Sequence, residues 1–334
     1  MSAAPERVLV TGATGFVGST LARLLAEEGR EVHALARAGS DRGPLEDLPL
    51  TWHAGDLEDA PSIERAVAAA GAGAAVVHSA AVISYRTADR ALQERVNVGG
   101  TRAVLDACRR AGAGRVVHVS SVVAVGTAPD ARGALDEDAD WNGASMRCAY
   151  ADTKRAAEEL ALGAADELDV VAVLPGAIFG PSPVPSNTTR FLQRIAAGAL
   201  GPAAPPGSLS VVGVDDAARG IRAALDRGRR GRRYLLTDEN LTHRELFERA
   251  AAELGSSAPR LTLPRPLWSL VVGGCALVDR LRPLELATPQ ALRLLGLHFR
   301  YDSGRARREL GWSPRPFAEI LRETVAWMRG RGLA

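Results

Sequence analysis

The stretch RVLVTGATGFVGSTLARLLAEEG, residues 7–29, decides the fold. Its first five residues predict a buried strand, and the apolar residues that follow recur at three- and four-residue spacing, which predicts a helix. Between the two, Gly12 permits a tight turn, Gly15 lets backbone N–H groups approach a pyrophosphate, and Gly18 lets the helix pack closely on the strand. The turn therefore predicts a dinucleotide site at the positive end of a helix. The cofactor-binding residues expected in it are Gly12, Thr14, Gly15, Phe16, Val17 and Gly18.

Strand and helix patterns alternate from this segment to residue 175. Continuous apolar strands of this kind suit a parallel sheet that is covered on both faces. The repeated strand–helix–strand order predicts an α/β fold, a doubly wound parallel Rossmann sheet. The further strands are expected at 31–36, 50–54, 74–79, 115–121 and 169–175, and the helices at 15–29, 61–70, 88–112 and 148–168.

After Gly176 the chain changes character, because two proline-rich segments, 180–187 and 201–208, bracket one short helix. This change predicts a smaller, mostly helical C-terminal lobe that binds the substrate. We expect residues 1–175 to form the NAD(P)-binding Rossmann domain, residues 208–237 to return to it, and residues 176–207 and 238–334 to form the substrate-binding lobe.

The 334 residues carry 41 Lys and Arg against 39 Asp and Glu, a formal net charge of +2. This balance gives no overall field for a nucleic acid or an anionic membrane. The three cysteines show no C-x-x-C spacing and the six histidines no ligand spacing, so we expect neither disulfides nor a metal site. A polar N-terminus with no signal-like apolar run leads us to expect a cytoplasmic protein.

Residues 267–278, LWSLVVGGCALV, form an uncharged run of twelve residues. The run is too short for a transmembrane helix, which needs about 20 residues. We expect it to form a buried or lobe-covering helix. An apolar mouth for the substrate, or a contact at an interface, is the alternative.

The choice of cofactor depends on the end of the second strand. NAD-binding units place an acidic residue there to bind the ribose 2′-hydroxyl. This chain has Arg37 instead, followed by Ser40 and Arg42. A guanidinium favours the 2′-phosphate of NADP, although Asp41 could still reach the ribose of NAD. We expect NADP(H), with NAD(H) as the alternative.

Two short motifs predict the catalytic chemistry. The fifth strand ends in V-V-H-V-S-S at Ser121, and Y-A-D-T-K follows at 150–154, which puts Tyr150 and Lys154 on one face of a helix. An ammonium beside a tyrosine favours its phenolate, so that Tyr150 can exchange a proton with a carbonyl or alcohol. Lys154 is the only lysine and there are four tyrosines, so chance places it four residues after one in only ~1% of cases.

These motifs, taken together, resemble the extended short-chain dehydrogenase/reductases of the NAD-dependent epimerase/dehydratase family. The likeness to its dihydroflavonol 4-reductase and 3β-hydroxysteroid dehydrogenase branch is the strongest. The shared order and spacing span nearly the whole chain. The motifs are T-G-A-T-G-F-V-G, G-D-L at 55–57, H-S-A-A at 78–81, R-V-N-V-G-G-T at 95–101, V-S-S, Y-x-x-x-K and P-G-A-I-F-G-P at 175–181.

The resemblance implies a role for each matching residue. Ser121, with Ser120 as its substitute, polarises the substrate oxygen together with Tyr150. Lys154 binds the nicotinamide ribose, and Asn97 supports the lysine or a proton-relay water. The resemblance also implies a homodimer formed through the helices at 88–112 and 148–168. Cofactor contacts are implied for Asp56 and Leu57 at the adenine, for Ala80 and Ala81 along the cofactor path, and for Pro175 to Ile178 at the carboxamide.

Two departures from the family's patterns indicate which of its activities this chain has. Val122 and Val123 stand where sugar dehydratases carry Asp-Glu, and a valine cannot move a proton. Residues 174–181, LPGAIFGP, lack the asparagine of nucleotide-sugar epimerases. We therefore expect an NADPH-dependent ketoreductase acting on a mostly apolar small molecule; the alternative is an NAD-dependent nucleotide-sugar epimerase, and more remotely a non-catalytic NADP-binding protein. The aromatic candidates for its pocket are Tyr85, Trp141, Phe179, Phe191 and Trp268.

Overall fold

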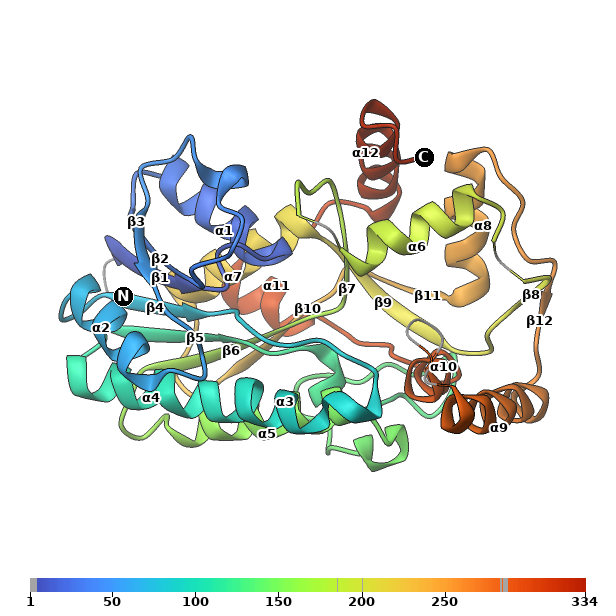
Figure 1. The fold of residues 1–334 in the computed structure, drawn as a ribbon, viewed down its shortest axis with the longest axis horizontal. Helices are drawn as coiled ribbons and strands as arrows, with labels where there is room; N and C mark the ends of the chain where they lie inside the picture. Colours follow the sequence, from blue (N-terminus) through green and yellow to red (C-terminus); the bar gives the residue numbers. More distant parts are fainter. Residues whose placement is uncertain (1–4, 185, 200, 283, 285–287) are drawn as a thin grey trace.

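Seven parallel strands form the large sheet of the computed structural model, which describes residues 5–184, 186–199, 201–282, 284 and 288–334 (Figure 1). The spatial order is β10-β6-β5-β4-β1-β2-β3. The chain adds β2 and β3 on one side of β1 and the later strands on the other side, so the strand order reverses between β1 and β4. In doubly wound sheets, ligands bind at this switch point, beyond the carboxyl ends of the strands. The strands are β1 (Arg7–Thr11), β2 (Glu31–Ala36), β3 (Thr51–Ala54), β4 (Ala75–His78), β5 (Arg115–Val119), β6 (Val170–Pro175) and β10 (Arg233–Leu236).

Helices cover both faces of this sheet, as Figure 1 shows. Along β1, Val8 and Val10 pack into one hydrophobic cluster and Leu9 into another, because successive side chains of a strand point to opposite faces. Both clusters are fully buried, which explains the continuous apolar strands. One face carries α1 (Phe16–Glu27), α7 (Val214–Arg227) and α11 (Gly304–Leu310), and the other carries α2 (Ala60–Ala70), α4 (Gly100–Ala111) and α5 (Ala149–Gly163).

A second, smaller part of the molecule is built around a three-stranded sheet in the order β11-β9-β7. Its core includes Phe179, which packs edge-on against Phe317 with ring centroids 5.1 Å apart. The strands are β7 (Ala177–Phe179), β9 (Ser208–Gly213) and β11 (Glu239–Thr242), with the short pair β8 (Ala203–Ala204) and β12 (Leu261–Thr262) beside them. The helices are α6 (Asn187–Ala196), α8 (His243–Leu254), α9 (Arg265–Leu281), α10 (Pro289–Leu295) and α12 (Phe317–Gly330).

The Rossmann fold with an added, largely helical lobe is therefore confirmed. The segment 208–237 divides between the two parts, because β9 joins the small sheet while α7 and β10 join the large one. Helix α11 was expected in the substrate-binding lobe with the rest of 238–334, but it packs on α7 and β10 of the large-sheet part. The indole N–H of Trp312, which follows this helix, donates a hydrogen bond to the Asp216 carbonyl oxygen at 2.8 Å. Residues 1–4, 185, 200, 283 and 285–287 of the expected ranges lie outside the described residues.

The helix expected at 88–112 is divided into three pieces. After α3 (Arg90–Gln93), residues Glu94–Gly99 form a π-helical turn, η3, before α4 begins. Such turns are frequent at functional sites, and this one contains Asn97. The remaining short turns are the 3₁₀ segments η1 (Gly43–Leu45), η2 (Thr87–Asp89), η4 (Val122–Ala124) and η5 (Gly143–Met146).

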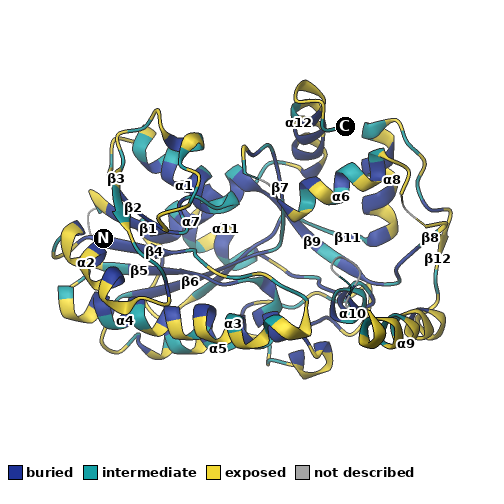
Figure 2. Ribbon diagram, in the orientation of Figure 1, coloured by how far each residue is buried: buried dark blue, intermediate teal, exposed yellow. Residues whose placement is uncertain are grey.

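The apolar run at 267–278 lies in α9, and of the two expected forms, a buried or a lobe-covering helix, it adopts the lobe-covering one. Trp268 is the one buried residue of this helix, and Figure 2 shows most of α9 in the colour of exposed residues. The helix covers the second lobe at its outer edge, where it packs on α10. Within the described residues, no helix is long and apolar enough to cross a membrane.

Candidate active site

The turn after β1 has the geometry that the glycine spacing predicts. Gly12 adopts a positive φ of 74°, and a Cβ atom on it would lie 2.8 Å from the backbone of Ala80, at the end of the neighbouring β4. A Cβ atom on Gly18 would overlap the carbonyl oxygen of Gly12. The Gly15 N–H donates to the same carbonyl oxygen at 2.9 Å, which closes the turn. Side chains are therefore excluded from the place where the strand, the turn and the helix meet.

This turn delivers the beginning of α1 to the switch point of the sheet. The helix begins after Gly15, and no side chain caps its first N–H groups. Uncapped N–H groups at the positive end of a helix dipole bind anionic oxygens. The turn thus fits the diphosphate of a dinucleotide, because no side chain blocks the approach of the phosphate oxygens to the backbone N–H groups.

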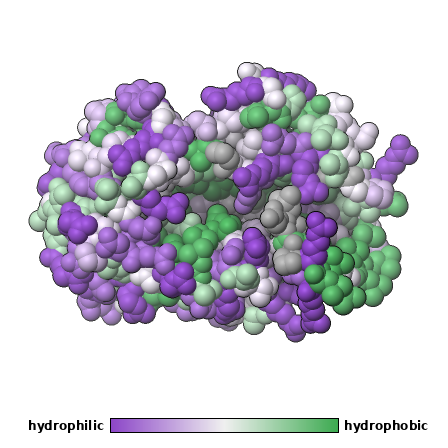
Figure 3. Space-filling view, in the orientation of Figure 1, coloured by the Kyte–Doolittle hydropathy of each residue, from purple (hydrophilic) through white to green (hydrophobic). Residues whose placement is uncertain are grey.

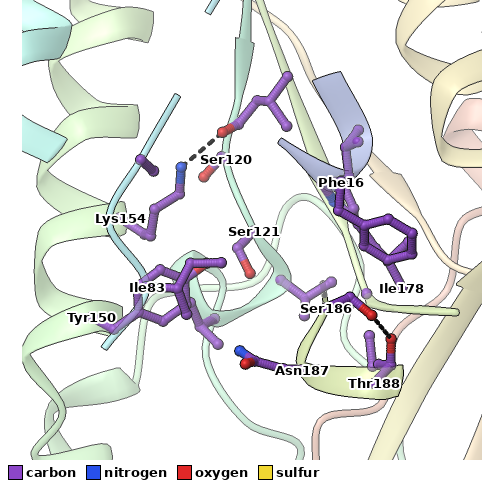
Figure 4. Close-up of a pocket in the computed structure, with 18 of the residues that line it drawn as sticks. Phe16, Ile83, Ser120, Ser121, Tyr150, Lys154, Ile178, Ser186, Asn187 and Thr188 are labelled. Carbon is purple, nitrogen blue, oxygen red and sulfur yellow. Dashed lines mark hydrogen bonds between the residues drawn. The ribbon is translucent and has the colours of Figure 1, made fainter. Parts of the chain in front are cut away.

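A cavity of about 590 Å³ extends from this turn to the second lobe. It lies beyond the carboxyl ends of β1, β5 and β6, and residues of α5, α6 and α10 line its sides. In Figure 4, Ser121 and Asn187 extend toward the space beside Tyr150, while Phe16 and Ile178 lie on the opposite side. The predicted site residues that line this cavity are Gly12, Gly15, Phe16, Val17, Gly18, Ala81, Ser121, Tyr150, Lys154, Pro175 and Ile178.

Other predicted residues lie around the cavity without lining it. Ala80 supports the glycine turn from β4, and Leu57 is buried against Gly100 of α4. Arg37 is exposed just beyond the end of β2. Asp56 accepts a hydrogen bond from the Glu58 N–H at 3.0 Å, which stabilises the loop after β3. Thr14 and Asn97 also lie outside the lining residues.

Tyr150 is buried, and burial raises its pKa to about 12, while a hydrogen bond with Ser121 acts in the opposite direction. Burial is the larger of the two influences on the pKa of Tyr150, and the Lys154 ammonium donates to the Val119 carbonyl oxygen. Tyr85 packs edge-on against the Tyr150 ring, with centroids 6.0 Å apart. Burial therefore favours the phenol form of Tyr150, which can donate a proton.

Lys154 is also buried, and its Nζ donates a hydrogen bond to the Val119 carbonyl oxygen at 2.7 Å. Burial lowers the pKa of Lys154 to about 8, and the carboxylate of Glu158 opposes that shift. The same carboxylate accepts a hydrogen bond from the Ser120 hydroxyl and pairs with Arg233 at 3.0 Å. Ser120 is thus held by Glu158, which leaves Ser121 as the hydroxyl beside Tyr150.

Asn97 joins two elements of the site, and its side-chain hydrogen bonds among the described residues go to Val82 and Thr153 rather than to Lys154. Its side-chain oxygen accepts from the Val82 N–H at 2.8 Å, and its amide nitrogen donates to the Val82 carbonyl at 3.0 Å and to Thr153 at 3.2 Å. Thr153 precedes Lys154 on α5. Asn97 therefore fixes the loop after β4 to the helix that carries the lysine.

Several cavity residues were not anticipated from the sequence. The beginning of α6 contributes Ser186, Asn187 and Thr188, and α10 contributes Leu294 and Leu295. The Ser186 hydroxyl accepts a hydrogen bond from the Thr189 N–H, a capping pattern that predicts where the helix begins but not what it faces.

Phe299 and His243 also line the cavity without having been anticipated. His243 is buried, and burial lowers its pKa to about 4, so it is neutral. Of the five aromatic candidates, Tyr85 lines the cavity, whereas Phe179 and Phe191 pack in the core of the second lobe. No cluster of three His, Cys, Asp or Glu side chains that could hold a metal ion occurs among the described residues.

A turn shaped for a diphosphate and a Ser–Tyr–Lys group share one cavity. This fold and site define a class, the NAD(P)-dependent oxidoreductases acting on CH–OH and C=O groups. The sequence profile of the NAD dependent epimerase/dehydratase family matches residues 8–236, and the chain belongs to this family. The prediction of an extended short-chain dehydrogenase/reductase is thereby confirmed.

Relatives of full length support this assignment. The chain is 37% identical to sterol demethylase protein B of Methylococcus capsulatus, over 97% of this chain and 99% of that protein. It is 33% identical to a Synechocystis sp. protein to which dihydroflavonol 4-reductase activity is ascribed, over 97% of this chain and 94% of the relative. The crystal structure of a nucleoside-diphosphate-sugar epimerase from Pseudomonas aeruginosa superposes with a TM-score of 0.80 at 27% identity, covering 98% of each chain.

Proposed function

We propose that the protein is an NADPH-dependent ketoreductase that reduces the carbonyl group of a mostly apolar small molecule. The observation that carries this proposal is the lining of the cavity: Lys154 is the one charged side chain among its described lining residues. Cavities with such walls bind ligands through apolar contact and a few placed polar groups. The apolar walls are formed by Ile83, Tyr85, Val119, Val122, Val123, Val184, Leu209, Leu294, Leu295 and Phe299.

The same lining argues against the other activities of the family. A sugar diphosphate is usually bound through charge-assisted hydrogen bonds from arginine, and no arginine lines the described cavity. A dehydratase needs a carboxyl group beside the substrate, and Val122 and Val123 supply only apolar contacts. Two relatives are named for a sterol and a dihydroflavonol, which supports a substrate of low polarity.

Each side chain of the site has a role in the proposed carbonyl reduction. When bound, the nicotinamide cofactor supplies a hydride to the carbonyl carbon. Ser121 donates a hydrogen bond to the substrate oxygen and stabilises the negative charge that develops there. Tyr150, a phenol held beside Ser121, gives its proton to the same oxygen. The ammonium of Lys154 would hold the ribose of the bound cofactor and would favour the tyrosinate that remains.

A preference for NADPH rests on the chain beyond β2. Arg37 is exposed there, and Arg42 is placed over the Trp52 ring, 4.8 Å from its centroid. The Asp41 carboxylate accepts a hydrogen bond from the Gly43 N–H at 2.9 Å, within its own turn. Arg37 is therefore the group that we assign to the 2′-phosphate, while Asp41 stabilises the turn.

We further infer that residues 1–175 bind the cofactor and that the small-sheet lobe binds the substrate, with segment 208–237 shared between them, because β9 belongs to the small sheet whereas α7 and β10 belong to the large one. The small-sheet lobe and the large sheet each provide one wall of the cavity, which supports this division. A homodimer through the helices at 88–112 and 148–168 remains a prediction, and light scattering of the purified protein tests it.

The test of the proposed function is a pair of measurements on purified protein. NADPH oxidation is followed with a panel of hydrophobic cyclic ketones and, separately, with nucleotide-diphosphate sugars. Mass spectrometry identifies the cofactor released on denaturation. Ketone-dependent NADPH oxidation supports the proposal. Tightly retained NAD with interconversion of sugars overturns it in favour of the epimerase, the alternative that the likeness to the Pseudomonas aeruginosa structure supports.

A further inference from the structure

Helix α9 has its apolar side turned outward. In a helix that covers a protein core, residues three and four apart form an apolar stripe on the inner side. Here that stripe faces solvent: Leu270 is 71% exposed and Leu281 is 83% exposed. With 3.6 residues per turn, the exposed apolar side chains share one side of the helix. They are Leu267, Leu270, Val271, Leu277, Val278 and Leu281.

The opposite side of α9 is fixed to the protein. Trp268 is buried and its indole N–H donates a hydrogen bond to the Leu292 carbonyl oxygen of α10 at 2.9 Å. Asp279 also belongs to the inner side, where it accepts from the Leu284 N–H at 2.8 Å. These contacts set the rotation of the helix about its axis. The fold therefore holds the six apolar side chains of the stripe on the solvent side of α9.

Arginines surround the stripe. Arg265 lies at the beginning of α9, Arg280 and Arg282 lie at its end, and Arg260 directly precedes β12. All four are exposed, and none forms an ion pair with another described residue. Figure 3 shows a hydrophobic patch at the lower right, where Figure 1 places α9, with hydrophilic side chains along its border. The near-neutral net charge of the chain conceals this local excess of positive charge.

We propose that α9 docks on the surface of a lipid bilayer that carries anionic headgroups. An apolar stripe bordered by arginines lies parallel to such a surface, with its aliphatic side chains among the acyl chains and its guanidinium groups at the phosphates. The long arginine stems reach the headgroups while their methylene groups stay in the apolar region. A second copy of the chain fits less well, because a symmetric contact through α9 would bring like charges together.

Docking through α9 would bring the cavity close to the bilayer. Helix α10, on which α9 is fixed, also carries Leu294 and Leu295 of the cavity wall. An apolar ketone dissolved in the bilayer would then reach the cavity without crossing water. This consequence rests on the proposed function, whereas the docking itself does not.

Vesicle flotation tests the docking. The full-length protein is mixed with vesicles of phosphatidylcholine and phosphatidylglycerol, or of phosphatidylcholine alone, and the floated fraction is measured. The wild type should float with the anionic vesicles and much less with the neutral ones. The triple variant Leu270→Gln, Leu277→Gln, Leu281→Gln should bind roughly 100-fold more weakly, since three apolar side chains lose their transfer from water. The matched variant Leu270→Ile, Leu277→Ile, Leu281→Ile should bind as the wild type does.

A second variant separates the charges from the stripe. Replacing Arg265, Arg280 and Arg282 by glutamine should abolish the preference for anionic vesicles and the sensitivity to salt. Circular dichroism and NADPH binding confirm that each variant is folded. Failure of the wild type to float, or equal flotation of the triple glutamine variant, overturns the proposal. So does a wild-type dimer that the triple glutamine variant dissociates, because a second copy would then cover α9.

The outcomes for docking and for catalysis are distinguishable. A protein that floats with anionic vesicles but reduces no ketone upholds the docking of α9 and overturns the proposed function. A protein that reduces ketones but binds no vesicles does the reverse. Neither measurement depends on the other, because NADPH turnover is followed without lipid and flotation without cofactor.

Discussion

The ammonium of Lys154 donates a hydrogen bond to the carbonyl oxygen of Val119, with Nζ and oxygen 2.7 Å apart. Val119 is the last residue of β5, and Ser121 follows two residues later. The lysine therefore ties α5, which carries Tyr150, to the strand that delivers the serine. This hydrogen bond therefore helps the fold to hold Ser121, Tyr150 and Lys154 in fixed positions relative to one another.

Replacing Lys154 by arginine should lower kcat/KM by about 100-fold or more. A planar guanidinium does not fit the buried space of a compact ammonium, and a displacement of about 1 Å in such a site has an effect of this size. The neighbouring exchange Arg155→Lys is the control, since Arg155 forms an ion pair with the exposed Glu159. Full activity of Lys154→Arg in a steady-state assay would remove the argument for the lysine.

Glu158→Gln should shift the pH profile of kcat/KM. Burial lowers the pKa of Lys154 to about 8 and the Glu158 carboxylate raises it, so removing that charge lowers the pKa further. The ammonium is present below this pKa and lost above it. The alkaline decline of kcat/KM, which reports groups of the free enzyme, should therefore begin at lower pH than in the wild type.

Two measurements accompany the Glu158→Gln profile. The melting temperature is recorded because Arg233 loses its charged partner, 3.0 Å away. Glu159→Gln, on the exposed side of the same helix, should leave the profile in place. An unchanged alkaline decline in Glu158→Gln would mean that Lys154 does not determine it.

The glycine turn and the Tyr150–Lys154 pair could be predicted because each depends on residues close together in sequence, and the parallel sheet could be predicted from the alternation of strand and helix patterns. Ser121 lies 29 residues before Tyr150, and its place beside the tyrosine was implied by the family resemblance. Asn187 and Leu294 could not be predicted, since their segments are far from β5 along the chain and meet the site only through tertiary packing. The exposure of α9 could not be predicted, because hydrophobicity alone does not distinguish a buried helix from one that covers the lobe with its apolar side outward. The depth at which the Tyr150 ring is buried could not be predicted either, because it depends on segments far away in the sequence.

Gly18→Ala should weaken NADPH binding by about tenfold or more and lower stability by about 1–3 kcal/mol, because its methyl group overlaps the Gly12 carbonyl oxygen and α1 must move. Gly163→Ala is the matched control: a Cβ atom there has no neighbour within 4 Å, and its position at the end of α5 is helical. Thermal unfolding and fluorescence titration measure both effects. Equal behaviour of the two variants would contradict the close packing at the turn.

Arg37→Asp should raise the KM for NADPH by about tenfold or more and reverse the preference between the two cofactors, because a carboxylate repels the 2′-phosphate and accepts a hydrogen bond from a ribose hydroxyl. Arg322→Asp on α12 changes the net charge equally, far from β2, and should leave both KM values unchanged. An unchanged KM ratio in Arg37→Asp would show that Arg37 does not choose the cofactor.

The most direct test of the central claim is the turnover of Tyr150→Phe, measured together with its affinity for NADPH. The substitution removes one hydroxyl group and keeps the ring that packs against Tyr85. If Tyr150 is the proton donor for a ketone, NADPH oxidation should fall by roughly 1,000-fold while the Kd for NADPH stays within about twofold. Turnover close to that of the wild type, with the same Kd, would contradict the proposed catalytic site.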